Sequence, residues 1–340
     1  MSARVTRKRA RLNSNDDNDV AGFGRKRDEE FWYDDGNIIL VARDVEFRVY
    51  KGLLADHSPV FRDMFSFPVP PPELSSAADT TGSACPVVQL FDSPEDVRHI
   101  LRFYMPRDDP SPFSTNEISF YMISAAVRLG QKYQMSKLYQ HAIDYLKEYF
   151  TEHLDVWEAH TDDGRLPPGF SDVHAIGVVN LARLTGEHTL LPTALLSCCM
   201  LSKAIVHGFA REDGTREQLA LADVGLCFAA KGRLIEESVR IALAVFLPTV
   251  AKTCVSVSEC VRGFRKIHVE LRDRARYIAT ADPFAPYHSM FGEELLCKHC
   301  RAMVKERDLW ERSATWSRLS EILGIESQAS DGLGRATTRE

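Results

Sequence analysis

The sequence lacks any feature that would place the chain in or across a membrane. No uninterrupted apolar run reaches the ~20 residues that a bilayer span requires, and the longest candidate, residues 241–250, contains Pro248. The N-terminus is basic and polar, without the apolar segment of a secretory signal. We therefore expect an intracellular protein without a membrane partner. In a reducing compartment its eight cysteines would be thiols or metal ligands rather than disulfides.

The motifs of the common enzymatic chemistries are also missing. The sequence has no glycine-rich phosphate loop, no GxSxG elbow and no HExxH pair. The carboxylate pairs Asp34-Asp35, Asp108-Asp109 and Asp162-Asp163 lie in polar, turn-like stretches. We therefore predict a non-enzymatic protein with no catalytic residues and no cofactor.

What is present is the composition of a globular protein. Hydrophobic residues make up 44% of the chain and charged residues 26%, a balance typical of folded domains. A length of 340 residues is enough for two domains of ordinary size.

The clearest local pattern lies in residues 31–65. An apolar run at 38–41 is followed by a polar break at 42–44, and apolar and charged residues then alternate over 45–49. An alternation of period two is typical of a half-buried strand, so the pattern predicts a β-hairpin. Helical spacing of apolar residues follows from Leu53 to Phe65. Ser58 is suited to the N-cap of a helix there, and Pro59 to its first turn.

Three segments carry a resemblance to a known family. They are FRVYKGLLADHSPVFRDMF (47–65), CPVVQLFDSPEDVRHILRFYM (85–105) and AAVRLGQKYQMSKLYQHAIDYL (125–146). Together they resemble the BTB/POZ domain, in the variant abundant in mushroom-type (basidiomycete) fungi, and the resemblance covers residues 31–150. NLARLTGEHTLLPTALLSCC (180–199) is similar to the segment that follows the BTB domain in those proteins.

The resemblance implies an α+β fold: a BTB/POZ domain, in which a small sheet is flanked by a helical cluster, followed by a mostly α-helical C-terminal region. It also implies a homodimer or BTB heterodimer that recruits other proteins as a scaffold or transcription co-regulator. The alternative is a substrate adaptor for a cullin-type ubiquitin ligase. Against it, the hydrophobe-x-Glu motif of cullin-binding BTB domains is not evident in residues 64–68.

The resemblance also points to five interface candidates. Tyr33, Ile39 and Val41 lie on the first expected strands. Asn37 stands where many BTB domains have Asp, and Lys51 stands at the basic partner's position, so the family's ion pair is lost. A buried lysine without that carboxylate would be costly. Corepressor recruitment through this pocket is therefore disfavoured.

Composition shifts divide the chain into segments. We expect a disordered basic arm at 1–30, the BTB/POZ domain at 31–150, a helical region at 151–325 and a disordered tail at 326–340. Residues 66–84, rich in proline and serine, predict a flexible insertion, with a proline-rich ligand segment as the alternative.

Further helix signals continue along the chain. Ser93-Pro94 predicts a helix start, Gly130 the end of a helix over 118–129, and residues 135–150 another helix. Asp172 or Ser171 is suited to cap a helix that begins nearby. Apolar periodicity at 219–228 and at 234–250 predicts two or three more helices.

Charge is unevenly distributed. Residues 1–27 contain eight Lys/Arg and three Asp, a net charge of +5, which leaves −11 for the rest of a chain whose total is −6. The clusters Arg7–Arg11 and Arg25–Arg27 predict either nuclear import or a solvated arm, with a cytoplasmic protein in the second case. Nucleic acid is a disfavoured partner because the acidic body repels phosphate and no aromatic residues accompany the basic ones.

Cys297 and Cys300 form a CxxC pair, which is half of a zinc site. The nearest candidates for the other half are Cys254 and Cys260, or His268 and His288. Because Cys254 and Cys260 are spaced more widely than a usual knuckle, we expect spare thiols and less than one zinc per chain. The opposite hypothesis is a four-thiolate site of Cys254, Cys260, Cys297 and Cys300 that staples the C-terminal helices.

Two other interpretations concern thiols. A redox pair at Cys297 and Cys300 is the enzymatic alternative, although the expected βαβ setting is missing. Cys198-Cys199 lies inside an expected helix, where packing explains both residues.

Overall fold

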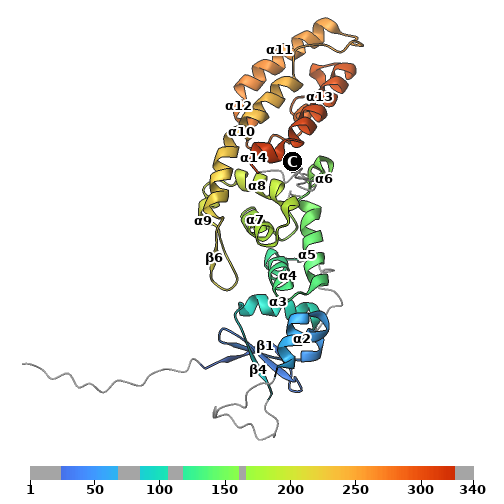
Figure 1. Ribbon diagram of the computed structural model, residues 1–340. Helices are drawn as coiled ribbons and strands as arrows, with labels where there is room; N and C mark the ends of the chain where they lie inside the picture. The colour runs from blue at the N-terminus through green and yellow to red at the C-terminus, as the bar shows by residue number, and fades with distance from the viewer. Residues whose placement is uncertain (1–23, 68–84, 106–117, 161–165, 326–340) are drawn as a thin grey trace, which may run out of the picture. The chain divides into compact units, whose positions relative to one another are not determined.

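The computed structural model describes residues 24–67, 85–105, 118–160 and 166–325. The chain divides into two compact units, one formed by residues 1–50 with 69–92 and the other by residues 51–68 with 93–340. In the described part, the first unit contains a four-stranded mixed sheet and the second contains all the helices (Figure 1). The fold is therefore α+β and mostly helical, as the sequence predicts.

The sheet has the strand order β1-β3-β2-β4. Its strands are β1 (Lys26–Trp32), β2 (Ile38–Ala42), β3 (Val45–Val49) and β4 (Val87–Leu90). The predicted hairpin is confirmed, because β2 and β3 pair antiparallel with Ala42 opposite Val45. Only Arg43 and Asp44 form the turn. Arg43 has a φ of 52°, in the left-handed region that tight hairpin turns use.

The inner strand β2 is buried along most of its length, with Ile38, Leu40 and Val41 at most 2% exposed. On β3, Phe47 and Val49 are completely buried while Arg48 between them is half-buried, as the period-two pattern predicts. These apolar side chains form the core of the sheet unit.

The boundary expected for the N-terminal arm is corrected, because residues 26–32 form strand β1, which pairs parallel with β3. Asp28 Oδ1 accepts the backbone N–H groups of Glu30 at 3.0 Å and Phe31 at 2.8 Å, which shapes an irregular strand. The Arg27 guanidinium lies 4.5 Å from the centre of the Trp32 ring. The cluster Arg7–Arg11, the proline-rich insertion and the C-terminal tail lie outside the described residues.

Two predicted helix starts are confirmed. Helix α2 (Pro59–Ser66) follows the shorter α1 (Lys51–His57), and the Ser58 side chain accepts the N–H of Phe61 at 3.0 Å. In the same way the Ser93 side chain accepts the N–H of Asp96 at 3.0 Å and caps α3 (Pro94–Tyr104). Such caps satisfy N–H groups that have no partner within the helix.

Gly130 does not end its helix. Helix α4 (Phe120–Lys132) runs through it and is followed by α5 (Ser136–Tyr149). A Cβ at Gly130 would lie 3.1 Å from the Cβ of Tyr139, so the glycine allows α4 and α5 to pack closely. The glycine at position 130 therefore reflects close helix packing and does not mark the end of a helix.

The C-terminal helices are mostly where periodicity predicts them, with two corrections. The stretches 219–228 and 234–250 belong largely to one helix, α10 (Leu221–Val245), because 229–233 are helix formers apart from one glycine. Helix α7 (His174–Thr185) begins after the expected caps, and neither Ser171 nor Asp172 caps it through its side chain.

The remaining described elements complete the second unit. They are α6 (Leu154–Ala159), η1 (His188–Leu190), α8 (Leu191–Met200), α9 (Ala204–His207), β5 (Phe209–Ala210), β6 (Arg216–Glu217), α11 (Val257–Asp273), α12 (Ala275–Ile278), η2 (Tyr287–Ser289), η3 (Glu293–Leu295), α13 (Lys298–Trp316) and α14 (Leu319–Leu323). Pro192 lies at the start of α8, as predicted, and Cys198 and Cys199 are buried in that helix.

The second unit is a series of packed helix pairs. Helix α4 contacts α3, α5 and α7, α7 contacts α8, and α10 contacts α8, α13 and α14 (Figure 1). Because α4 and α7 pack within one unit, residue 150 is not a boundary between the compact units. None of the described helices has both the length and the apolar character of a membrane span.

Candidate metal centre

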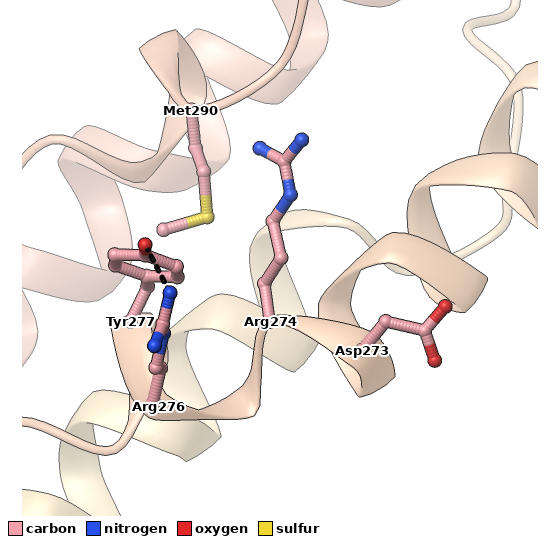
Figure 2. Close-up of a pocket in the computed structure, with 5 residues that line it drawn as sticks. All are labelled: Asp273, Arg274, Arg276, Tyr277 and Met290. Carbon is pink, nitrogen blue, oxygen red and sulfur yellow. Dashed lines mark hydrogen bonds between the residues drawn. The ribbon is translucent and has the colours of Figure 1, made fainter.

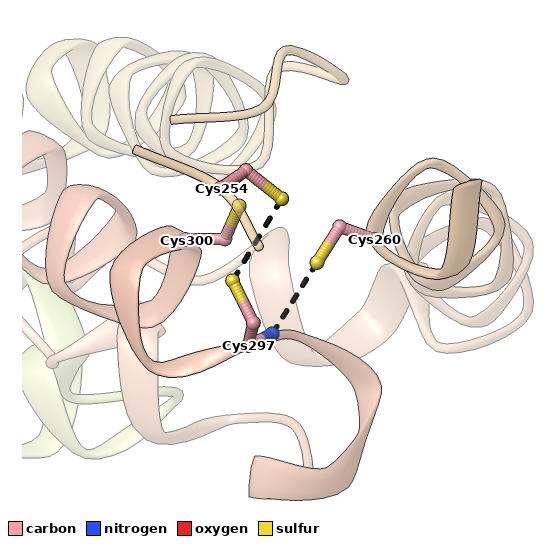
Figure 3. A group of neighbouring side chains, drawn as sticks. All are labelled: Cys254, Cys260, Cys297 and Cys300. Atoms are coloured by element: carbon pink, nitrogen blue, oxygen red, sulfur yellow. Dashed lines mark hydrogen bonds between the residues drawn. The ribbon is translucent and has the colours of Figure 1, made fainter. Parts of the chain in front are cut away.

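Four cysteines from separate parts of the C-terminal region come together in space (Figure 3). Cys254 lies in the connection between α10 and α11, and Cys260 lies in the first turn of α11. Cys297 directly precedes α13, and Cys300 lies in its first turn. All four Sγ atoms lie within 4.8 Å of one another.

The spacing of the sulfurs is that of metal ligands and not of disulfides. Cys254 and Cys297 have their Sγ atoms 3.8 Å apart, far longer than the ~2.05 Å of an S–S bond. All four residues are free cysteines. Tetrahedral ligands with Zn–S bonds of ~2.3 Å lie about 3.8 Å from each other, so the observed separations need little adjustment to enclose an ion.

Backbone N–H groups donate to several of the sulfurs. The N–H of Cys297 donates to Cys260 Sγ at 3.3 Å, and the N–H of Ala251 donates to Cys300 Sγ at 3.4 Å. Donors of this kind stabilise negative charge on sulfur. The segments around the cysteines are therefore folded in a way that suits thiolates.

The thiols differ in their pKa values because their surroundings differ. The backbone N–H of Cys300 donates toward Cys297 and is the main reason that the Cys297 pKa falls to about 6. Burial raises the pKa of Cys300 to about 12 and also raises that of Cys260. The position of Cys297 at the start of α13 adds the positive end of a helix dipole.

The cluster is part of an apolar core. Cys300 is completely buried and Cys260 is 1% exposed, while Cys254 and Cys297 are half-buried. The side chains packed around them include Val245, Phe246, Phe264, Ile267, Tyr287 and Leu296. Water has little access to the two buried sulfurs.

Gly263 brings the segments of the cluster close together. It lies one turn after Cys260 on α11, and a Cβ built there would lie 2.0 Å from the carbonyl oxygen of Leu295. Since that contact is with backbone, a larger residue would push α11 away from the segment that leads to Cys297. The sequence analysis missed this residue, because an isolated glycine inside a helical pattern has no partner visible in the sequence.

The two histidines considered as ligands lie in other environments. His268 Nδ1 lies 3.2 Å from the carbonyl oxygen of Phe264, one turn earlier on α11. His288 Nδ1 lies 2.5 Å from Asp308 Oδ2, and Asp308 also accepts from Arg312. The structure therefore brings together the cysteine quartet and leaves both histidines outside it.

The setting also differs from that of a redox CxxC pair. Cys297 is preceded by the 3₁₀ turn η3 and not by a strand. The second pair of thiols lies within reach of the first, an arrangement that suits metal binding more than exchange with a partner disulfide.

A pocket of about 670 Å³ opens at the end of α11 (Figure 2). It is lined by Asp273, Arg274, Arg276, Tyr277 and Met290. Arg274 pairs with Glu270 at 3.7 Å, and Arg276 donates to the Tyr277 hydroxyl at 2.8 Å while stacking on that ring.

The predicted interface residues have different exposures. Val41 is completely buried, so it belongs to the core of the sheet unit and not to its surface. Tyr33 and Ile39 are half-buried, and Asn37 and Lys51 are exposed. Within the single chain Lys51 is therefore not a buried cation.

Comparisons with known proteins identify no related protein. The chain matches no model of a known protein family, and a search of curated proteins finds no significant similarity. The BTB/POZ resemblance therefore remains a prediction from the residues that carry it.

Proposed function

We propose that this is a non-enzymatic protein–protein interaction protein of the BTB/POZ kind, which self-associates and recruits partners as a scaffold or transcription co-regulator. The main observation that supports the proposal is the order of the strands and helices that the resembling segments form. Hairpin β2–β3 leads into the helix pair α1–α2, and strand β4 then pairs parallel with β2 before α3 begins. The first two resembling segments thus contribute strands to the sheet and the helices that follow those strands, which supports the proposal.

Apolar exposure on the sheet unit supports self-association. Phe91, directly after the outer strand β4, is 93% exposed, and Val87 on that strand is 45% exposed. Exposed apolar side chains at a sheet edge favour pairing with another chain. Tyr33, which is half-buried, offers a further contact.

Light scattering on the full chain after size-exclusion chromatography, at tens of micromolar, tests the proposal. We expect a dimer, and we expect Phe91→Asp and Tyr33→Ala to shift it towards monomer. Phe228→Asp is the matched control, because Phe228 is a 68% exposed phenylalanine on α10 in the other unit. A wild-type chain that stays monomeric contradicts self-association.

The cullin adaptor is the second candidate. The observation against it is the end of α2 at Ser66, after which Phe67 is exposed. The sequence continues with Pro68, and no glutamate stands where the cullin-binding motif would need one. Affinity purification of the tagged full chain from cells, followed by mass spectrometry, separates the two roles. Cullin recovered at the level of other stable partners would favour the adaptor, and its absence would favour the scaffold.

We assign nuclear import to Arg7–Arg11. The second basic cluster, Arg25–Arg27, runs into β1: Arg25, just before the strand, lies 3.6 Å from Glu46, and Arg27 stacks on Trp32. In the full chain fused to a fluorescent reporter, alanine at Lys8 and Arg9 should abolish nuclear accumulation. Alanine at Lys26 and Arg27 should leave it unchanged, and an even distribution of the wild type would contradict the proposal.

A further inference from the structure

We propose that Cys254, Cys260, Cys297 and Cys300 bind one Zn²⁺ in a closed tetrahedral site that joins α11 to α13. The proposal rests on the convergence of the four sulfurs within 4.8 Å and on the 3.8 Å separation of Cys254 and Cys297. It is independent of the BTB/POZ proposal, because all four ligands lie beyond residue 250.

The donor set selects the metal. Four thiolates in a tetrahedral arrangement are the ligands of structural zinc or of iron. A cluster of several irons would hold its cysteine sulfurs farther apart than a single ion does. Sulfur–sulfur separations within 4.8 Å therefore fit a single ion. Of the two metals, zinc fits a purely structural site, because it has no redox chemistry.

The charge of such a site is compensated locally. Four thiolates and one Zn²⁺ carry a net charge of −2. The N–H groups of Cys297 and Ala251 already donate to two of the sulfurs.

The site is structural in type. All four positions around the ion are filled by protein ligands, whereas a catalytic zinc keeps one position for water or substrate. The burial of Cys260 and Cys300 closes the inner side of the site. Zinc bound here would stabilise the fold without supplying a reactive centre.

The packing of α11 explains why a metal ion would stabilise this region. The main neighbours of α11 are the short elements η3 and α12. The ligands close a loop that runs from Cys260 through α11, α12, η2 and η3 to Cys297. Binding an ion at its base ties the start of α11 to the start of α13, since the unfolded chain has no such preformed site.

The test measures metal in the full chain, purified under reducing conditions without a metal-affinity tag. Mass spectrometry of the metal content should find about one zinc per chain in the wild type. Cys254→Ser and Cys297→Ser should lose most of it. Cys85→Ser is the matched control, because Cys85 is a half-buried cysteine in the other unit and lies outside the quartet, and this variant should keep about one zinc.

Cobalt substitution keeps the test informative if a serine variant fails to fold. Wild-type protein stripped of metal and loaded with Co²⁺ should show the intense thiolate charge-transfer bands and the visible d–d bands of a tetrahedral four-sulfur site. Added Zn²⁺ should displace the Co²⁺ and abolish these bands. Absence of zinc together with absence of these bands would overturn the proposal, as would stoichiometric iron, a disulfide within the quartet, or zinc retained by the cysteine variants.

Discussion

We expect protonation of a buried histidine to make the fold sensitive to acid. His174, at the start of α7, is 7% exposed and stacks on Phe120 with ring centres 4.6 Å apart. The rings of Tyr121, Phe170 and Phe209 surround it. Its Nδ1 accepts the backbone N–H of Ser171 at 3.1 Å, which requires that this nitrogen carries no proton.

Burial lowers the pKa of His174 from 6.5 to about 4. Between these two values the unfolded chain binds a proton that the folded chain excludes, so the free energy of unfolding falls as the pH falls. With these two pKa values, linkage gives a free energy of unfolding about 2 kcal/mol lower at pH 5 than at pH 8. The contribution of His174 to stability is complete above the pKa of the unfolded chain, 6.5, and is lost as the pH falls from there toward the folded pKa of about 4.

Urea unfolding followed by circular dichroism at pH 8 and pH 5 measures the effect. Other groups also contribute to the pH dependence of stability, among them Asp308, whose pKa is raised by burial. The informative quantity is therefore the change in the free energy of unfolding between pH 8 and pH 5, compared between the wild type and His174→Gln. The glutamine side chain cannot be protonated in this range. His207→Gln is the control, because His207 is exposed at the end of α9.

The expected result is that His174→Gln loses about 2 kcal/mol of the pH dependence and His207→Gln loses little of it. An unchanged pH dependence in His174→Gln would refute the reasoning. So would an NMR titration in which the His174 ring protonates near pH 6.5, since burial would then not exclude the charge.

Three further substitutions follow from the packing of the second unit. Gly263→Ala should cost about 1–3 kcal/mol because its Cβ meets a backbone carbonyl, whereas Gly225→Ala, with open space on α10, should be neutral or stabilising in thermal unfolding. Arg312→Met should cost about 3–5 kcal/mol because it removes the arginine that pairs with the completely buried Asp308, and adding Asp308→Asn should recover part of that loss in a double-mutant cycle. Ser58→Ala should cost about 1–2 kcal/mol, since its buried hydroxyl caps α2 and donates to a carbonyl 2.5 Å away; a loss below about 0.5 kcal/mol would contradict that role.

Local signals in the sequence were sufficient for much of the fold. The β2–β3 hairpin and the starts of α2 and α3 were predicted because each depends on residues within a few positions of one another. Alternation sets the faces of a strand, and a serine side chain reaches an N–H three residues ahead. The resemblance implied a mixed α+β fold, and apolar periodicity predicted the helices of the second half.

Only the tertiary structure decided the features that depend on distant partners. Strand β1 forms because β3 offers it an edge, and Gly130 continues its helix because α5 packs against it. The four cysteines are the strongest case. The sequence by itself determined the CxxC pair, but the spacing of Cys254 and Cys260 gave no reason to place them beside it. Their convergence follows from the packing of α10, α11 and α13 around one apolar core, and no local pattern records the distance between helices that are far apart in the chain.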